Sequence, residues 1–291
     1  MPIIPLQGDT VAIMRDSADK HQRVKPFLRW AGGKTKFVHE IVSRLPPLPA
    51  SATYYEPFLG AGAVFLAYAP QRAILSDLNP DLVFAFTSVR NHPIEVAKKL
   101  YALGRRDSEK AYYSARDRFN ACKQRNYLQA ARFIYLNQTS FNGIYRVNKQ
   151  GLYNVPYGFK ITPRIPGKIE LEATSAILKR ATIKLADYSE ITQEASKGDV
   201  VYLDPPYPPL NGTSFFTHYT KERFAHEDQV KVADTAHELR GRGCTVVITN
   251  ADTPAIRKLY STWNISEITR PRWVTSSCHK HKVIELIITS Y

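Results

Sequence analysis

The chain has 291 residues, 44% of them hydrophobic and 23% charged, which predicts a globular protein with one large domain or two unequal ones. The 40 Lys and Arg residues outnumber the 26 Asp and Glu residues, and the net charge of +14 indicates either a polyanionic partner such as nucleic acid or a solvated basic surface. No apolar run approaches about 18 residues and the N-terminal stretch lacks the apolar region of a signal peptide, so we expect a cytoplasmic protein without a membrane span.

The first predicted elements surround a glycine turn. Residues 53–58 are predicted to form a strand that leads into Gly60-Ala61-Gly62, after which an apolar helix begins. Glycines at this point let the backbone approach a ligand at the carboxyl end of the strand, although a tight strand-to-helix turn would also use them. The nicotinamide-binding glycine pattern is absent because position 65 is Phe.

A second strand, residues 73–76, ends at Asp77. An acidic residue about 20 positions after a glycine turn can bind the ribose hydroxyls of a nucleoside cofactor. An isolated Asp at this point would more commonly cap a helix. Together, the glycine turn and Asp77 indicate a nucleoside-cofactor site.

A basic stretch then interrupts the strand-and-helix alternation. Between Phe84 and Glu170 there are 16 Lys and Arg residues and 5 Asp and Glu residues, a net charge of +11. We predict helices over residues 94–101 and 110–131, followed by a hairpin-and-loop region over residues 139–167 that is rich in Asn, Gly, Tyr and Pro. An insertion of this size predicts a second, smaller domain.

After the insertion the strand-and-helix pattern resumes, with a helix expected over residues 227–240. Strands that alternate with helices predict an α/β fold, in which a mostly parallel sheet is covered on both faces. The expected strands here are residues 183–186, 199–203, 245–249 and 283–289.

The tetrapeptide Asp204-Pro205-Pro206-Tyr207 carries the chemistry. It follows a buried apolar strand, and its two prolines fix an extended backbone and remove two backbone donors. The remaining carboxylate, carbonyl and aromatic ring suit an exocyclic amine such as adenine N6, whose two N–H groups can donate to Asp204 and to the Pro205 carbonyl while Tyr207 stacks on the base. Accepting both hydrogen bonds favours sp³ geometry at a nitrogen that is otherwise a poor nucleophile, and stabilises charge as it develops. A proline-rich turn that ends a strand is the structural alternative.

With these motifs in this order, the sequence resembles the Dam family of N6-adenine DNA methyltransferases over nearly its whole length. The segment Phe27-Leu28-Arg29-Trp30-Ala31-Gly32-Gly33-Lys34 is similar to the family's N-terminal cofactor motif and is its most specific feature. The glycine turn, Asp77 and the tetrapeptide 204–207 are shared by many amino-methyltransferases.

The resemblance implies S-adenosylmethionine as the cofactor. Trp30 and Lys34 would contact it, Asp77 would bind its ribose, Asp187-Tyr188 would hold its adenine, and Asp204 would lie near its methionine ammonium. No metal is implied, and Cys278-His279-Lys280-His281 offers too few well-placed ligands for a structural zinc site. The expected cofactor residues are Trp30, Lys34, Glu56, Pro57, Phe58, Gly60, Gly62, Asp77, Asp187, Tyr188 and Asp204.

The segment 137–148 is similar to the family's target-reading hairpin. Arg146 would read a guanine through a bidentate contact, or else bind a phosphate, and Ile144 would act as a wedge or contact a thymine methyl. Arg29 stands where Dam enzymes often carry Lys, so the two arginines could serve the guanines of GATC. Lys160 replaces an aromatic residue, and the basic stretch 276–282 is shorter than expected. The expected DNA-binding residues are Arg29, Asn142, Ile144, Arg146, Asn148, Pro156 and Lys160.

These observations predict a class I (Rossmann-like) S-adenosylmethionine-dependent methyltransferase sheet, mostly parallel with an antiparallel carboxyl-terminal hairpin, and an inserted helical and hairpin DNA-recognition domain. Residues 1–22 form an N-terminal extension, residues 23–81 and 169–291 the catalytic domain, and residues 82–168 the recognition domain. The cofactor segment at residues 27–34 folds back onto the sheet. The expected partner is duplex DNA, and a monomer is enough for the reaction. The alternatives are an RNA or protein-glutamine methyltransferase and a catalytically inactive DNA-binding homologue.

Overall fold

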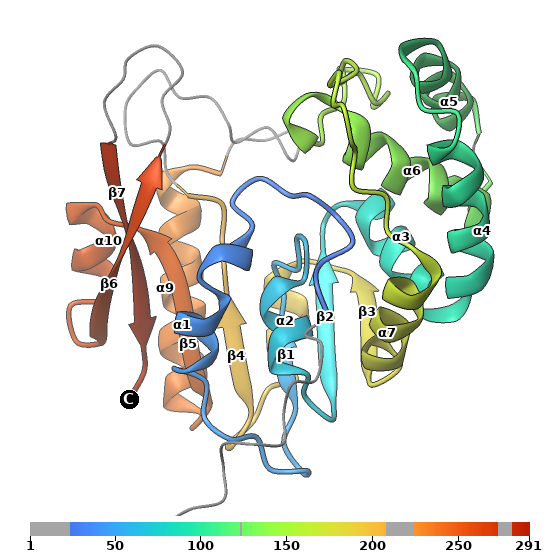
Figure 1. Cartoon of the computed structure of the whole chain (residues 1–291). Coiled ribbons are helices and arrows are strands. Elements are labelled where there is room, and N and C mark those ends of the chain that lie inside the picture. Colours follow the sequence, from blue (N-terminus) through green and yellow to red (C-terminus); the bar gives the residue numbers. More distant parts are fainter. Residues whose placement is uncertain (1–23, 123, 208–223, 273–280) are drawn as a thin grey trace, which may run out of the picture.

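A seven-stranded sheet lies at the centre of the computed structural model, which describes residues 24–122, 124–207, 224–272 and 281–291 (Figure 1). The strand order is β3-β2-β1-β4-β5-β7-β6. The pairs from β3 to β5 are parallel, whereas β7 is antiparallel to both β5 and β6. The strands are β1 (Tyr54–Glu56), β2 (Ala73–Asp77), β3 (Ala181–Leu185), β4 (Val200–Leu203), β5 (Thr245–Ala251), β6 (Asn264–Arg272) and β7 (His281–Thr289).

Several of the helices begin at side-chain caps that the sequence supplies. Asn79 accepts hydrogen bonds from the backbone of Asp81 and Leu82 at 3.0 and 3.1 Å, and Pro80 occupies the first turn of α3. None of the helices formed by the described residues is long and apolar enough to cross a membrane. The helices are η1 (Lys34–Lys36), α1 (Val38–Val42), α2 (Ala63–Tyr68), α3 (Pro80–Asn91), α4 (Pro93–Gly104), α5 (Glu109–Ala121), α6 (Tyr127–Thr139), η2 (Phe141–Gly143), α7 (Lys168–Leu178), α8 (Tyr188–Thr192), α9 (His226–Gly241) and α10 (Pro254–Leu259).

Both faces of the central strands β4 and β5 are buried, as their continuous apolar runs predict. Successive residues of a strand point to opposite faces, so Val200 and Tyr202 of β4 join one hydrophobic cluster while Val201 and Leu203 join the other. Helices α1 and α2 cover the first face and α9 and α10 the second (Figure 1). The predicted α/β architecture, with a mostly parallel sheet and an antiparallel carboxyl-terminal pair of strands, is confirmed.

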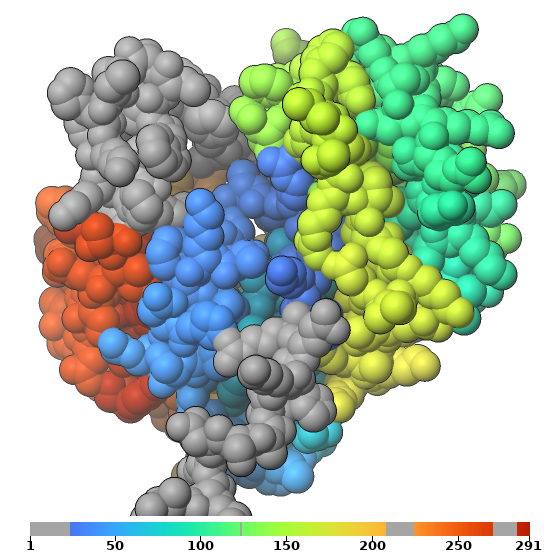
Figure 2. Space-filling view, viewed as in Figure 1, coloured from blue at the N-terminus to red at the C-terminus, as the bar shows by residue number. Residues whose placement is uncertain are grey.

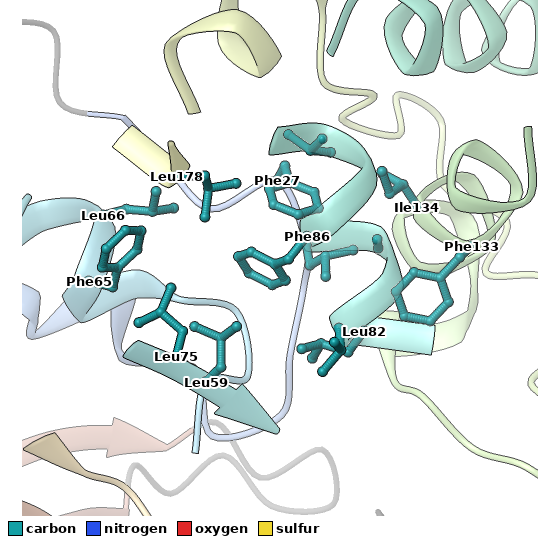
Figure 3. Close-up of a cluster of buried hydrophobic side chains, with 14 of the residues drawn as sticks. Phe27, Leu59, Phe65, Leu66, Leu75, Leu82, Phe86, Phe133, Ile134 and Leu178 are labelled. Carbon is teal, nitrogen blue, oxygen red and sulfur yellow. The ribbon is translucent and has the colours of Figure 1, made fainter. Parts of the chain in front are cut away.

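Helices α3 to α7 form a layer beside the sheet and share its core. Phe27 of the N-terminal segment packs edge-on against Phe86 of α3, with ring centroids 4.7 Å apart. Leu75 of β2 lies on one side of this contact and Phe133 of α6 on the other (Figure 3). The helical layer and the sheet therefore have one continuous hydrophobic core.

The prediction of one helix over residues 110–131 is wrong. The structure has two helices, α5 and α6, because the chain is extended at Asn126, whose side chain accepts a hydrogen bond of 3.1 Å from the backbone of Gln129 and caps α6. Strand β6 was not located from the sequence. The predicted hairpin of residues 139–167 contains two isolated antiparallel bridges, Ser140 with Tyr157 and Val147 with Tyr153.

The strand order places a binding edge between β1 and β4. The chain runs from β1 outward to β3 and then returns to β4 on the other side of β1, so the order reverses there. In open α/β sheets, ligands bind outside the carboxyl ends of the strands at such a reversal. Glu56 ends β1, Asp77 ends β2 and Asp204 follows β4, so all three carboxyl groups lie at this edge.

Candidate active site

Asp204 stands directly after β4 and is held from two sides. Its Oδ2 lies 2.8 Å from Nζ of Lys34, and its Oδ1 accepts a hydrogen bond of 2.8 Å from the hydroxyl of Thr249 on β5. The side chain is 19% exposed, so the carboxylate keeps access to a ligand. A fixed, partly open carboxylate can accept a further hydrogen bond without first being ordered.

Lys34 connects the N-terminal segment to the tetrapeptide. Its side chain is 4% exposed, and its ammonium donates to the Gly32 carbonyl at 2.7 Å besides pairing with Asp204. The same ammonium lies 4.6 Å from the ring centroid of Tyr207, within range of a cation–π interaction. A buried ammonium requires such partners. In Figure 2 the blue N-terminal segment lies between the orange and red elements that end the chain and the yellow-green segment of the helical layer.

Tyr207 is held at both ends of its side chain. Its hydroxyl donates to Oε2 of Glu285 on β7 at 3.1 Å, while the ammonium of Lys34 lies over the ring. The side chain of Glu285 is 6% exposed. The orientation of the tyrosine ring is therefore set by residues from both ends of the chain.

The glycine turn lies next to Asp77 and Trp30. Gly60 and Gly62 have φ values of +48° and +66°, which favour glycine. The backbone N–H of Gly60 donates to Oδ2 of Asp77 at 3.0 Å, and a Cβ added to Gly60 would lie 3.0 Å from Cδ1 of Trp30. The indole stacks in turn on the ring of Tyr145, with centroids 5.7 Å apart. Trp30, the turn and Asp77 thus form one contiguous group.

Phe58, Tyr188 and Asp187 lie together beyond β1. The rings of Phe58 and Tyr188 are stacked, with centroids 5.3 Å apart and an interplanar angle of 26°. Asp187 caps α8, since its Oδ1 accepts from the backbone of Ser189 at 3.0 Å. The pair of rings beside a carboxylate offers an apolar surface with an acceptor for an amino group, which suits a purine base.

Glu56 is a buried carboxyl group with a tyrosine partner. It is 2% exposed and accepts a hydrogen bond of 2.6 Å from the hydroxyl of Tyr54. The pKa of Glu56 is raised from 4.5 to about 8, mainly by burial; the Tyr54 hydrogen bond opposes the rise and the charge of Asp204 contributes to it. Glu56 is therefore a neutral acid below this pH.

The stability of a Glu56→Gln variant is expected to depend less on pH than the stability of the wild-type protein. Between the unfolded pKa of 4.5 and the folded pKa of about 8, the folded chain keeps a proton that the unfolded chain releases, so the free energy of unfolding falls as pH rises through this window. Gln removes the titration and keeps an acceptor for Tyr54. Urea unfolding of both proteins at about pH 6 and at pH 8 measures the difference. Glu95→Gln, which changes an exposed glutamate, is the control. The expectation would be contradicted if the free energy of unfolding of Glu56→Gln fell with pH as much as that of the wild-type protein.

The predicted target-reading hairpin and the segment that pairs with it, through the bridge of Val147 with Tyr153, present alternate residues to solvent. Tyr145 and Val155 are buried, whereas their neighbours Arg146 and Pro156 are exposed. The guanidinium of Arg146 donates from Nε to Oδ1 of Asn154 at 2.8 Å and from Nη2 to the Asn154 carbonyl at 3.2 Å. These bonds orient the side chain and leave other guanidinium donors for a ligand.

The other hairpin residues fall into two groups. Asn142 is exposed with a φ of +53°, whereas Ile144 is half-buried and packs against the core. Asn148 closes the turn of the hairpin, because its Oδ1 accepts from the backbone of Gln150 at 3.0 Å and of Leu152 at 2.9 Å. The side-chain oxygen of Asn148 is thus engaged within the turn.

Arg29 and Lys160 lie close together at the base of this hairpin. The Arg29 side chain crosses Gly143, where an added Cβ would lie 2.6 Å from the guanidinium Cζ. Lys160 donates to the Gln138 carbonyl, and its pKa is lowered to about 8 by burial and by the charge of Arg29. Nη1 of Arg29 is buried without a hydrogen-bond partner among the described residues. This unpaired donor is available to a ligand that enters here.

Comparison with known proteins identifies the family. The family model described as D12 class N6 adenine-specific DNA methyltransferase matches residues 30–274. The chain belongs to this family. It is 36% identical to the Type II methyltransferase M1.LlaDCHI of Lactococcus lactis subsp. cremoris over 92% of this chain and 96% of the relative. It is 37% identical to the Type II methyltransferase M.MjaIII of Methanocaldococcus jannaschii, covering 92% of this chain and 99% of the relative. A DNA adenine methylase of Vibrio cholerae serotype O1 is 35% identical, covering 91% and 96%.

As a D12 methyltransferase, the protein is an adenine-specific DNA methyltransferase that depends on S-adenosylmethionine. The predicted family and enzyme class are confirmed. The family description names DNA, which sets aside the RNA and protein-glutamine alternatives. The names of the relatives give no recognition sequence, so they leave GATC a prediction.

The edge of the sheet fits the cofactor of a D12 methyltransferase. The glycine turn permits a close backbone approach, Asp77 lies beside it as an acceptor for hydroxyl groups, and the Phe58–Tyr188 pair offers rings with Asp187 adjacent. Among the described residues, no group of three or more His, Cys, Asp or Glu could hold a metal ion. The predicted N-terminal extension, residues 1–22, lies outside the described residues. So does the basic stretch 276–282, which includes the candidate metal run at Cys278, except for the β7 backbone at residues 281 and 282.

Sequence reasoning missed the residues that hold the tetrapeptide from behind. Thr249, Gln229 and Glu285 are each bonded to a residue of 204–207, although they come from β5, α9 and β7. One signal was available in the sequence, since Thr249-Asn250 places two polar residues at the end of the apolar run 246–248. A polar pair there indicates buried groups that need partners.

Proposed function

We propose that this D12 methyltransferase binds duplex DNA, flips the target adenine out of the stack, and methylates its N6 at the tetrapeptide 204–207. One observation carries the proposal. The carboxylate of Asp204 is fixed at the carboxyl edge of the sheet, 19% exposed, beside the point where the strand order reverses. Flipping is required because the reacting nitrogen is inaccessible inside a duplex, and it costs a few kcal/mol.

The chemistry follows from the acceptors at this edge. One N–H of adenine N6 donates to Asp204 and the other to the Pro205 carbonyl, while Pro206 fixes the backbone and Tyr207 stacks on the base. Both bonds aim the nitrogen lone pair away from the acceptors, and the carboxylate stabilises the positive charge that develops on N6. S-adenosylmethionine, when bound, would supply an electrophilic methyl group and leave as the thioether once its sulfur–methyl bond breaks. The methylated N6 then releases one of its two protons to solvent. Direct transfer needs no covalent enzyme intermediate, so the protein contributes position and electrostatics.

The cofactor site is proposed on the same edge, within a class I methyltransferase domain of residues 23–81 and 169–291. Trp30 and Lys34 enter from the N-terminal segment, Asp77 would bind ribose hydroxyls, and Asp187 with Tyr188 would hold the adenine ring. The contiguous packing of Trp30, Gly60 and Asp77 supports this assignment. The other assigned residues are Glu56, Pro57, Phe58, Gly62 and Asp204.

Residues 82–168 are proposed as the DNA-recognition domain. Arg146 is exposed and oriented by Asn154, which suits a bidentate contact with guanine. Arg29 has an unpaired buried donor at the base of the hairpin. The oriented Arg146 and the unpaired donor of Arg29 support recognition of the two guanines of GATC, with Ile144 against a base. Asn142, Asn148, Pro156 and Lys160 complete the proposed contact surface.

Mapping of methylated adenines in plasmid DNA tests this proposal. The wild-type protein is expected to methylate GATC, and Arg146→Ala is expected to relax the choice of base at one guanine by about 10- to 100-fold, because a bidentate contact contributes ~1–3 kcal/mol. Arg118→Ala, an exposed arginine of α5, is the matched control and should weaken binding uniformly without changing the site. Methylation at other adenines by the wild-type protein would refute GATC, and transfer to no adenine would refute the proposed reaction.

A further inference from the structure

We propose that a buried polar layer behind the tetrapeptide positions its reacting groups. Thr249 and Tyr202 form one arm, which aims the carboxylate of Asp204. Asn250 and Gln229 form the other arm, which fixes the backbone at Pro206. This inference rests on the proposed catalytic role of Asp204.

The first arm has a defined direction. The Thr249 hydroxyl lies 2.8 Å from Oδ1 of Asp204 and 2.8 Å from the hydroxyl of Tyr202. A carboxylate can only accept, so Thr249 gives its single proton to Asp204 and must accept from Tyr202. Tyr202 is 1% exposed, and burial and the charge of Asp204 raise its pKa well above 10.0, so it remains a donor. The relay therefore runs from Tyr202 through Thr249 to Asp204.

The second arm ends on a backbone carbonyl. The Asn250 side-chain amide donates to Oε1 of Gln229 at 2.9 Å, and Nε2 of Gln229 donates to the Pro206 carbonyl at 2.8 Å. The Asn250 oxygen accepts from the backbone of Ala251 at 2.8 Å, which fixes the orientation of the amide. Among the described residues no hydrogen bond is directed at the Pro205 carbonyl, so this arm engages one carbonyl and leaves the reacting one open.

The register of the sheet explains why β5 supplies both arms. Strand β5 runs parallel to β4, and Ile248 of β5 pairs with Leu203, the last residue of β4. The residues that follow this pair, Thr249 and Asp204, are therefore neighbours. Thr249 is 2% exposed and Asn250 is not exposed at all, whereas the three residues before them, 246–248, are apolar. Burying polar groups costs free energy unless they are bonded, and here Thr249 bonds directly to Asp204 while Asn250 reaches Pro206 through Gln229.

Steady-state kinetics of two Thr249 variants test the first arm. Thr249→Val keeps the shape but removes the proton given to Asp204, so kcat is expected to fall about 10- to 100-fold with KM for S-adenosylmethionine and for DNA changed less than about two-fold. Thr249→Ser restores the hydroxyl and should recover most of kcat. Thr245→Val makes the same change at the opposite end of β5, beside Val200, and should leave kcat unchanged.

The second arm is tested by Gln229→Met, which should also lower kcat rather than raise KM, because it frees the Pro206 carbonyl. The proposal would be overturned if Thr249→Val kept the wild-type kcat, or if Thr249→Ser lost as much kcat as Thr249→Val. It would also be overturned if the variants changed KM alone. Asp204→Ala in the same assay separates the two claims. If Asp204→Ala is inactive and Thr249→Val is normal, only this inference fails, whereas an active Asp204→Ala removes the proposed function itself.

Discussion

Asp204→Ala and Asp204→Asn are expected to bind DNA while losing methyl transfer by at least about 10³-fold in kcat. Asp204 supplies the charged acceptor of the proposed mechanism, and neither variant can stabilise the positive charge that develops on N6. Asn is the sharper test because it keeps the shape and one acceptor oxygen of the side chain. Transfer of a labelled methyl group from S-adenosylmethionine to duplex DNA measures the loss, and a binding assay on the same samples shows that DNA is retained.

Both variants also leave the ammonium of Lys34 without its carboxylate. Lys34 is 4% exposed, and its other partners among the described residues are the Gly32 carbonyl and the Tyr207 ring, so the variants should unfold at lower urea concentration. The assay must therefore use conditions in which the variants are folded. Asp252→Asn is the matched control, since Asp252 follows β5 at the same edge and pairs with Arg257 at 2.6 Å. Near-normal turnover by Asp204→Asn would remove Asp204 from its role.

The central sheet could be predicted because local signals agree with the fold. Each predicted strand overlaps an observed one, and Asp77 and Asp204 stand at the ends of strands as expected. Strand alternation and turn residues are short-range properties, and for β4 they coincide with burial on both faces. The position of Asp204 at the edge follows from the apolar run that precedes it and the prolines that follow.

The contacts of the site could not be predicted in the same way. Lys34 and Asp204 are distant in the sequence, and their pairing depends on how the N-terminal segment crosses the sheet. The bonds from Thr249, Gln229 and Glu285 depend on strand order and register. The break before α6 shows the limit of periodicity, since the cap at Asn126 outweighs the helical pattern on either side of it.

The affinity for duplex DNA is expected to fall steeply with salt. The segment from Phe84 to Glu170 has a net charge of +11, and among its described residues Arg164 alone forms an ion pair with a carboxylate, that of Glu170. Most of its basic side chains are therefore available to phosphate. If about six to ten phosphates are contacted, the affinity should fall about 10³- to 10⁵-fold between about 50 and 200 mM salt, because each contact releases condensed counterions. Fluorescence anisotropy of a labelled duplex over this range measures the slope.

Two single variants locate the source of that slope. Lys149→Ala removes an exposed charge from the turn of the reading hairpin and should reduce the slope of log affinity against log salt by about 1. Lys231→Ala removes a charge that is 68% exposed on α9 and pairs with Asp228, and it should leave the slope unchanged. An equal effect of both would mean that binding follows net charge alone, and a flat salt dependence of the wild-type protein would contradict phosphate contact by the helical layer. A slope carried by the hairpin would place the duplex where Arg146 and Arg29 can reach base edges and where a flipped adenine can reach Asp204.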